Sequence, residues 1–283
     1  MPRAIHRIGK KLFFGRFQRT WRWPEEIPEA DWERVTFPSA NGARLAAVFG
    51  ASRGGPAEGA IVLAHPMGAA AKGFWLKRGH AELLRNSRFH VLAFDFNGFG
   101  ESESSDFDYP ADVIAAGEYL RRRVPALPLA VVGASFGAGY ALCAMARPAH
   151  PFRAAVLEST FPSLPYYWRP YPLPYVLLRA SQIIYPRFER ELRPILAATQ
   201  LKASPQILLI HGEADSITPV QVGTELRAAM SGGASVELWT VAGAEHNLAF
   251  PAQPDTYAQR VTSFLQRAFG KHAESSRYGK ATD

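Results

Sequence analysis

The sequence contains a single cysteine, Cys143, among its 283 residues. One thiol cannot form an internal disulfide, so nothing indicates oxidising export and we expect a cytoplasmic location. The neighbours of Cys143 are small or apolar, which favours a buried structural thiol over a nucleophile. No cluster of Cys and His has the spacing of metal ligands, so we expect neither a metal ion nor an organic cofactor.

Internal repeats are also lacking, and residues 1–23 contain no long uninterrupted apolar run. Without such a run, this segment is expected to be neither a signal-peptide core nor a membrane span. The chain is 47% hydrophobic, and its 283 residues suffice for one large globular domain with a substantial core.

Acidic residues are absent from residues 1–23, which contain the basic residues Arg3, Arg7, Lys10, Lys11, Arg16, Arg19 and Arg22. The net charge is +7, and the other 25 basic residues equal the 25 acidic ones in number. The body of the protein is therefore formally neutral. Such a distribution does not support nucleic-acid binding.

The same segment carries apolar residues at helical spacing, namely Ile5, Ile8, Leu12, Phe13, Phe14, Phe17 and Trp21. This pattern predicts a basic amphipathic segment over residues 1–24. Two interpretations stay open. In the first, residues 1–23 lie on an anionic membrane surface as a peripheral contact. In the second, the helix packs on the domain and leaves its basic face in solvent.

Strand and helix patterns alternate along the rest of the chain. The expected strands cover residues 35–37, 45–49, 59–65, 89–96, 129–132, 152–158, 205–212 and 236–241. The expected helices cover residues 75–85, 111–123, 136–146, 219–230 and 256–269. Asn41-Gly42 predicts an antiparallel hairpin between the first two strands. The alternation predicts an α/β fold with a mostly parallel central sheet and helices on both faces, over residues 25–270. We expect residues 271–283 to form a disordered tail.

The pentapeptide Gly133-Ala134-Ser135-Phe136-Gly137 joins an apolar strand to a helix of small residues. A G-x-S-x-G sequence between strand and helix is typical of the nucleophile elbow of serine hydrolases. The glycines let the strand and helix pack closely around a strained turn, so that the hydroxyl of Ser135 stands clear of the sheet.

A serine nucleophile needs a base and an orienting acid. Asp215 and His246 follow Ser135 in the chain, and each lies just past a predicted strand, at the edge where open α/β sheets form their sites. Some alternatives stay open. In one alternative, Asp215 only caps the following helix. In a second, Glu213 is the orienting acid. In a third, His246 is an ordinary histidine of a surface loop.

Several short stretches together make the chain resemble the serine-nucleophile α/β-hydrolases: HPMG at 65–68, DFNGFGES at 95–102, GASFG at 133–137, HGEAD at 211–215 and EHN at 245–247. The resemblance implies that Ser135 is the nucleophile, His246 the general base and Asp215 the acid. An oxyanion hole also needs two N–H donors, and Phe136 is expected to supply one. Family members commonly have His-Gly where this chain has His65-Pro66. Because proline has no N–H, Met67 is the expected second donor.

Residues 161–199 interrupt the alternation between two predicted strands, with seven prolines and eight aromatic residues. Short helices are expected at 176–184 and 188–198. An insertion after the sixth strand of an α/β-hydrolase commonly forms a lid that excludes water and shapes an acyl pocket. Candidate pocket residues are Tyr166, Tyr167, Trp168 and Leu177, which would otherwise form the small core of the lid itself.

The sequence predicts a serine hydrolase that cleaves carboxylic ester or thioester bonds through an acyl-enzyme. The aromatic insertion and the basic, apolar N-terminus favour a small-molecule or lipid ester with a hydrophobic acyl group. Peptidase, amidase and acyltransferase chemistry use the same triad. A catalytically silent interaction protein on a hydrolase scaffold is the alternative from another class.

Overall fold

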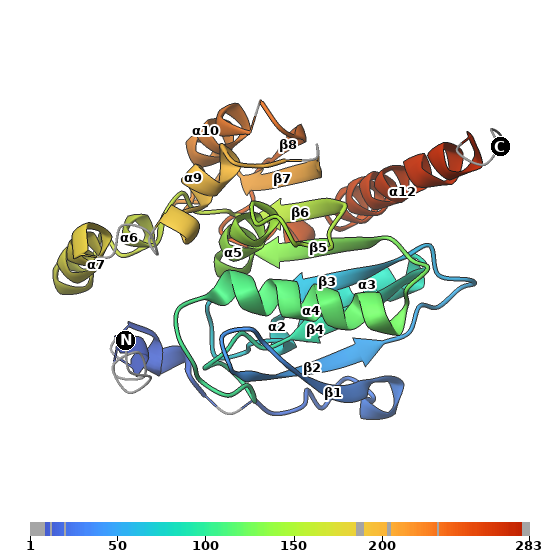
Figure 1. Cartoon of the computed structure of the whole chain (residues 1–283), viewed down its shortest axis with the longest axis horizontal. Helices are drawn as coiled ribbons and strands as arrows, with labels where there is room; N and C mark the ends of the chain where they lie inside the picture. The colour runs from blue at the N-terminus through green and yellow to red at the C-terminus, as the bar shows by residue number, and fades with distance from the viewer. Residues whose placement is uncertain are drawn as a thin grey trace.

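A computed structural model of the chain describes residues 9–11, 13–19, 21–184, 190–202, 205–230 and 232–278. Its centre is an eight-stranded sheet in the order β1-β2-β4-β3-β5-β6-β7-β8 (Figure 1). The strands are β1 (Glu33–Pro38), β2 (Arg44–Gly50), β3 (Gly59–Ala64), β4 (Phe89–Phe94), β5 (Leu129–Ala134), β6 (Ala154–Glu158), β7 (Gln206–Gly212) and β8 (Ser235–Val241). Strand β2 runs antiparallel to both of its neighbours, and the other pairs are parallel.

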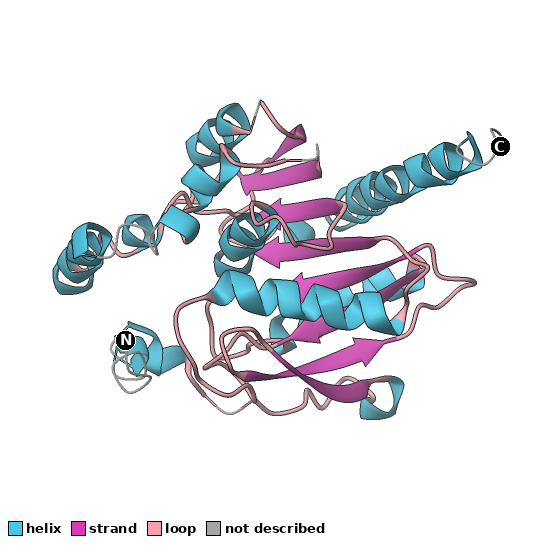
Figure 2. Ribbon diagram, in the orientation of Figure 1, coloured by secondary structure: helices cyan, strands magenta, loops and turns pink. Residues whose placement is uncertain are grey.

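Helices cover both faces of this sheet (Figure 2). The longer ones are α4 (Tyr109–Arg123), α5 (Phe136–Met145), α7 (Pro172–Ile184), α10 (Val220–Ala229) and α12 (Pro254–Tyr278). The shorter ones are α2 (Gly73–Lys77), α3 (His80–Asn86), α6 (Leu164–Tyr167), α9 (Pro194–Ala198) and α11 (Ala249–Ala252), with 3-10 turns η1 (Gly15–Phe17) and η2 (Glu29–Asp31). One buried cluster joins α4, α5 and α10 to the sheet, and a second joins α2, α3 and α12 to the other face. The predicted α/β fold is confirmed.

The central strands explain why the sheet is parallel. Every residue of β3, β5 and β6 is buried, as expected for strands that are covered on both faces. The parallel register aligns Ala64 with Gly133, and Ala134 with Glu158, at the carboxyl ends of neighbouring strands. The loops that follow these strands therefore meet at a single edge of the sheet.

Three predicted helices differ from the observed ones. The helix expected at 75–85 is two helices, because Gly79 between α2 and α3 adopts a positive φ of 77°. The helix expected at 188–198 is wrong as a single element. Pro194 opens α9 and holds Arg193 in an extended conformation, while residues 185–189 lie outside the described residues. Helix α7 begins at Pro172, earlier than the predicted residue 176.

The last helix is longer than the sequence predicts. Helix α12 continues past Phe269 to Tyr278, through the first part of the segment 271–283 that was expected to be a disordered tail. Residues 279–283 lie outside the described residues.

The described part of the N-terminal segment packs on the domain. Phe14 is fully buried, and its ring lies within 6.4 Å of the rings of Phe99, Phe107, Tyr109 and Phe136, measured between centroids. Lys10 is also buried, and its ammonium donates to the backbone and side-chain oxygens of Asn97. Packing on the domain therefore holds for these residues, but the basic side chains are not all in solvent, because Lys10 is buried. Residues 1–8 lie outside the described part. No helix in the described ranges is both long enough and apolar enough to cross a membrane.

Candidate active site

The turn between β5 and α5 places Ser135 at the carboxyl edge of the sheet. Ser135 has φ 49° and ψ −109°, a strained conformation for a residue with a side chain. A Cβ on Gly137 would lie 1.9 Å from the carbonyl oxygen of Ala64, and one on Gly133 would lie 2.7 Å from the backbone of Ala138. Both positions therefore require glycine, and the elbow has the close packing that its sequence pattern predicts.

The structure brings the three predicted triad side chains together. His246 Nε2 lies 2.9 Å from Ser135 Oγ, and His246 Nδ1 lies 2.9 Å from Asp215 Oδ2. One ring nitrogen thus faces the hydroxyl while the other faces a carboxylate. This geometry lets an imidazole accept the hydroxyl proton while the carboxylate fixes its tautomer and stabilises its charged form.

The carboxylate of Asp215 is buried and receives several hydrogen bonds besides that of His246. Its Oδ1 accepts from the amides of Ile217 and Thr218, and its Oδ2 accepts from the hydroxyls of Thr218 and Ser159. Burial alone would raise the pKa of Asp215. The bonds and charge of His246 and the bonds from Thr218 outweigh it and lower this pKa to about 2. The group is therefore a carboxylate at neutral pH.

The alternative acid and the alternative role of Asp215 are not supported. Glu213 is exposed, two residues before the buried Asp215. Helix α10 begins after Pro219 and has no side-chain cap, so Asp215 does not cap it. Asp215 instead holds the turn that precedes the helix through the amides of Ile217 and Thr218.

Two adjacent residues at the end of β6 support the site and were missed by the sequence interpretation. The hydroxyl of Ser159 donates to Asp215 and accepts from the amide of Asn247, the residue after His246. Glu158 Oε1 accepts from the amide of Ala249, farther along the same loop. Ser159 also has a positive φ of 52°, a conformation that no local sequence pattern reveals. The end of β6 thus fastens the loop that carries His246.

Glu158 is a buried carboxyl group close to the triad. Burial raises its pKa to about 7, although the amide of Ala249 and the nearby charges of His246 and Arg78 lower it. Arg78 in turn donates to the carbonyl of Asn247. Glu158 therefore changes its charge near neutral pH beside the histidine loop.

The predicted oxyanion donors have free amides. Within the described part of the chain, the backbone N–H groups of Met67 and Phe136 donate no hydrogen bond. Met67 follows His65 and Pro66, and Phe136 opens α5, where the helix dipole favours negative charge. His65 itself is fully buried. Its Nε2 accepts from the amide of Phe96 and its Nδ1 lies 2.7 Å from the carbonyl of Pro66, so it holds two loops together.

The predicted pocket residues are divided between two environments. Tyr166 and Tyr167 are half-buried against the core cluster that contains Phe136. Trp168 is buried, and its ring contacts Phe13 of the N-terminal segment at 6.1 Å between centroids. Leu177 is 40% exposed on α7, unlike the other three residues. A substrate pocket formed by these four residues stays a prediction.

The fold and the arrangement of the strand-end loops define an α/β-hydrolase, and structural similarity agrees. The Pyrococcus furiosus esterase Pf2001 superposes with a TM-score of 0.70 at 19% identity, over 89% of this chain and 98% of that one. Acetyl xylan esterase 1 from Thermoanaerobacterium sp. JW/SL YS485 superposes with a TM-score of 0.62 at 17% identity, over 87% of this chain and 86% of that one. At these identities the likeness concerns the fold.

Sequence similarity identifies the family. Residues 94–272, more than half of the chain, match the prolyl oligopeptidase family. The chain therefore belongs to this family and is a serine hydrolase with the α/β-hydrolase fold.

Three proteins of other organisms are similar in sequence to this chain. Human protein ABHD12B is 28% identical over 163 residues, which are 51% of this chain and 42% of that protein. Zebrafish (Danio rerio) lysophosphatidylserine lipase ABHD12 is 25% identical over 162 residues, which are 51% of this chain and 40% of that protein. The chain thus spans less than half the length of these two relatives. The uncharacterized protein YfhR of Escherichia coli K12 is 29% identical over 249 residues, which are 83% of this chain and 81% of that protein.

Proposed function

We propose that this protein hydrolyses carboxylic esters or thioesters through an acyl-enzyme on Ser135. The observation that carries the proposal is the line of hydrogen bonds from Ser135 Oγ through His246 to Asp215. In this mechanism Ser135 Oγ attacks the carbonyl carbon while its proton moves to His246 Nε2. Asp215 keeps its charge throughout and stabilises the imidazolium.

In the next step His246 acts as an acid instead of a base. His246 gives its proton to the departing alcohol or thiol, which leaves an acyl ester on Ser135. Water then enters, loses a proton to His246 and attacks the acyl carbonyl, and the acid leaves as Ser135 regains its proton. The amides of Met67 and Phe136 are the proposed donors to the negative oxygen in both steps.

A hydrophobic acyl substrate is supported by the segment between β6 and β7 and by the relatives. Tyr166 and Tyr167 lie half-buried against the core cluster to which Phe136, the residue after the nucleophile, also belongs. This packing on the face of the sheet that carries α5 supports a role for the insertion as an aromatic lid. Two structural neighbours are esterases, and one relative is a lysophosphatidylserine lipase. These names favour ester and lipid-ester substrates for this chain.

Peptide cleavage is the second candidate, because the chain belongs to the prolyl oligopeptidase family. An amide substrate would use the same Ser135, His246 and Asp215, with an amine as the leaving group. The described residues supply no feature that selects an amide over an ester.

A substrate panel separates these outcomes. Purified protein is assayed with p-nitrophenyl esters of increasing chain length, thioesters, lysophospholipids and peptide p-nitroanilides. We expect the highest kcat/KM with an ester or thioester that carries an apolar acyl chain. A preference for p-nitroanilides would replace the proposal with a peptidase. Loss of all turnover in Ser135→Ala, with an unchanged melting temperature, is the control for contaminating esterases.

A further inference from the structure

Helix α7 presents its apolar side to solvent. Leu173 is 64% exposed, Val176 59%, Ile183 81% and Ile184 64%. The side of the helix that faces the protein includes Leu178 and Gln182, which are 8% and 9% exposed. An ordinary surface helix turns its apolar side toward the core, whereas most of the large apolar side chains of α7 face solvent.

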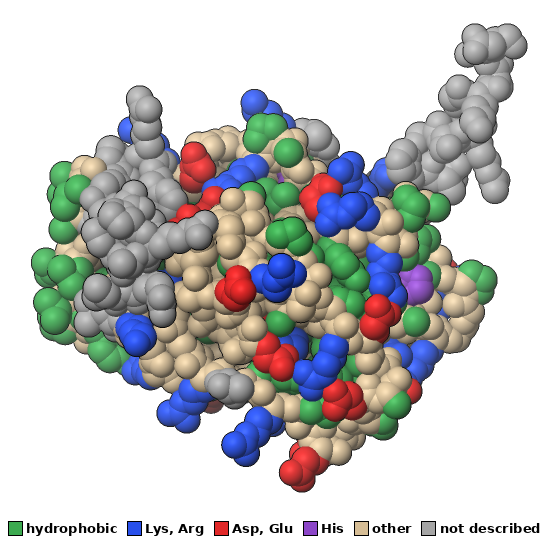
Figure 3. Space-filling model, turned by 60° about the horizontal axis from the view of Figure 1, so that its bottom comes forward, with side chains coloured by type: hydrophobic (Ala, Val, Ile, Leu, Met, Phe, Trp, Pro, Cys, Tyr) green, Lys and Arg blue, Asp and Glu red, His purple; other side chains and the backbone are tan. Residues whose placement is uncertain are grey.

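The exposed apolar residues share one side of the helix. Leu173, Leu177, the half-buried Ala180 and Ile184 follow one another at intervals of four, three and four residues, which aligns them along the axis. Val176 and Ile183 flank this row. Figure 3 shows hydrophobic side chains gathered at the left edge of the molecule, the side on which α7 lies in Figure 1. A contiguous exposed patch of this kind is typical of an interaction surface.

Basic residues border this patch, while acids are absent from its stretch of chain. Residues 159–184 contain Arg169 and Arg179 and no Asp or Glu, and both arginines are exposed. The N-terminal segment adds more positive charge, because Lys11, Arg16 and Arg19 are also exposed.

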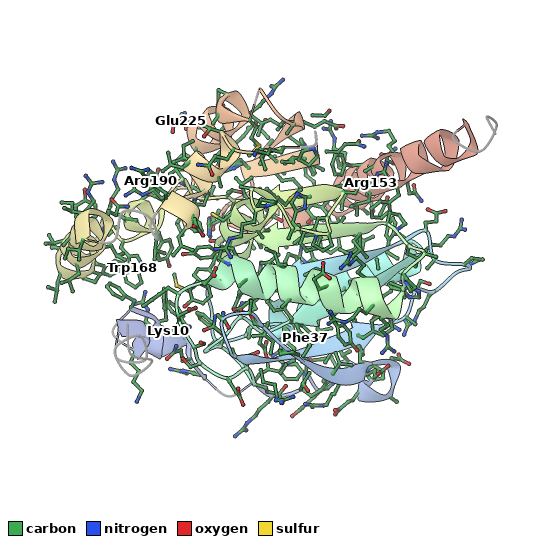
Figure 4. The ribbon with its side chains drawn as sticks, in the orientation of Figure 1. Lys10, Phe37, Arg153, Trp168, Arg190 and Glu225 are labelled. Atoms are coloured by element: carbon green, nitrogen blue, oxygen red, sulfur yellow. The ribbon has the colours of Figure 1, made fainter. Side chains whose placement is uncertain are left out.

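The N-terminal segment contacts the insertion directly. The guanidinium of Arg16 lies 5.9 Å from the ring of Trp168 and 5.7 Å from that of Tyr171, the residue before α7. Trp168 also packs on Phe13. Figure 4 labels Lys10 and Trp168, which lie at the same end of the molecule. The basic segment and the apolar helix therefore form one continuous surface.

We propose that this surface docks on an anionic lipid bilayer, with the apolar side of α7 at the headgroup boundary and the basic residues on lipid phosphates. The apolar side chains of the N-terminal segment cannot serve this purpose where Phe14 and Trp21 are buried in the protein. The segment instead supplies charge, and α7 supplies the apolar area. An apolar helix face combined with Lys and Arg is the pattern of interfacial membrane binding.

Charge decides between a bilayer and a second copy of this chain. Two copies that met through α7 would bring their basic residues together, and like charges across an interface oppose association. An anionic bilayer offers both an apolar layer and the opposite charge. It also places the segment between β6 and β7, which follows the strand beside the elbow, against a source of lipid esters.

Vesicle binding tests the proposal without any assay of turnover. The full-length protein is mixed with vesicles of phosphatidylcholine alone or with phosphatidylglycerol, and binding is measured by flotation. We expect binding to the phosphatidylglycerol vesicles at least about tenfold stronger than to phosphatidylcholine alone, and weaker at high salt. The double variant Leu173→Gln, Ile184→Gln is expected to reduce binding by about tenfold or more.

Ile217→Gln is the matched control, because Ile217 is 41% exposed but lies outside α7. Its vesicle binding is expected to equal that of the wild type. Glutamine is a good helix former, and circular dichroism melting verifies that the double variant is folded. Equal binding by the double variant and the wild type would overturn the proposal. So would absence of binding to anionic vesicles, or a dimer in sedimentation velocity that the double variant converts to a monomer. These outcomes do not depend on esterase activity.

Discussion

The hydroxyl oxygen of Ser159 lies 2.9 Å from Asp215 Oδ2 and 3.1 Å from the amide nitrogen of Asn247, from which it accepts a hydrogen bond. One side chain at the end of β6 thus links the loop of the acid to the loop of the histidine. Ser159 touches no reacting atom in the proposed mechanism, and it is therefore a positioning residue.

Ser159→Ala is expected to lower kcat by about tenfold to a hundredfold with a smaller change in KM. The reason is that a hydrogen bond to a charged group contributes about 1.5–3 kcal/mol. Steady-state kinetics measure the effect, with kcat and KM determined separately for the wild type and the variant.

The control for Ser159 is Ser105→Ala, which removes another buried hydroxyl that donates to the carbonyl of Asn41, away from the site. It should affect stability only. Equal losses of kcat in the two variants would show that Ser159 has no special link to the triad.

Glu158 makes stability depend on pH. A glutamate in the unfolded chain ionises near its ordinary value of 4.5, whereas in the folded protein burial raises this pKa to about 7. The folded state binds more protons in this interval, so the free energy of unfolding falls as pH rises through it. Glu158→Gln removes the titration while keeping an acceptor for Ala249. Between pH 4 and pH 8, the free energy of unfolding of the variant should therefore rise by about 3 kcal/mol relative to that of the wild type.

Urea unfolding at several pH values measures this difference. The exposed Glu225, labelled in Figure 4, gives the matched variant Glu225→Gln, which should follow the wild type at each pH. Parallel stability curves for Glu158→Gln and the wild type would mean that Glu158 does not hold a proton in the folded protein.

The identity of the acid can be tested by two amide substitutions. Asp215→Asn should lower kcat by about 10³-fold or more, because an amide favours the wrong imidazole tautomer. Glu213→Gln should leave kcat near the wild-type value, since Glu213 is exposed. A larger loss in Glu213→Gln would reverse the assignment. Stopped-flow measurement of acylation identifies the step that is slowed.

The elbow should not tolerate a methyl group at Gly137. Because a Cβ there would lie 1.9 Å from the oxygen of Ala64, Gly137→Ala should shift the strand and helix apart and lower the melting temperature strongly. Gly270→Ala adds the same methyl to α12 where no atom lies within 4 Å. It should be neutral or raise stability by about 0.5–1 kcal/mol, as expected for alanine in a helix. Similar melting temperatures for the two variants would contradict the close packing at the elbow.

The sequence predicted the features that depend on local pattern. Ser135, Asp215 and His246 could be located because each follows a recognisable strand, and parallel strands deliver their ends to one edge. Ser159 could not be found in this way, because its role depends on a positive φ and on contacts with two loops far along the chain.

The periodicity of a sequence also does not show which way the apolar side of a helix faces. The apolar spacing of α7 indicates an amphipathic helix, but it does not reveal whether the apolar side faces the core or solvent. Leu177 was a candidate pocket residue because it belongs to the expected lid insertion, and its side chain is exposed. The N-terminal segment is the opposite case, since Phe14 was a candidate for membrane contact and is fully buried.

The central claim is that Ser135 is a nucleophile activated by His246. Incubation with a fluorophosphonate, followed by peptide mass mapping, tests it most directly. We expect one covalent adduct on the peptide that contains Ser135, and its loss in Ser135→Ala and in His246→Ala under the same brief exposure. Folded wild-type protein that stays unlabelled, or an adduct on another residue, would contradict the claim.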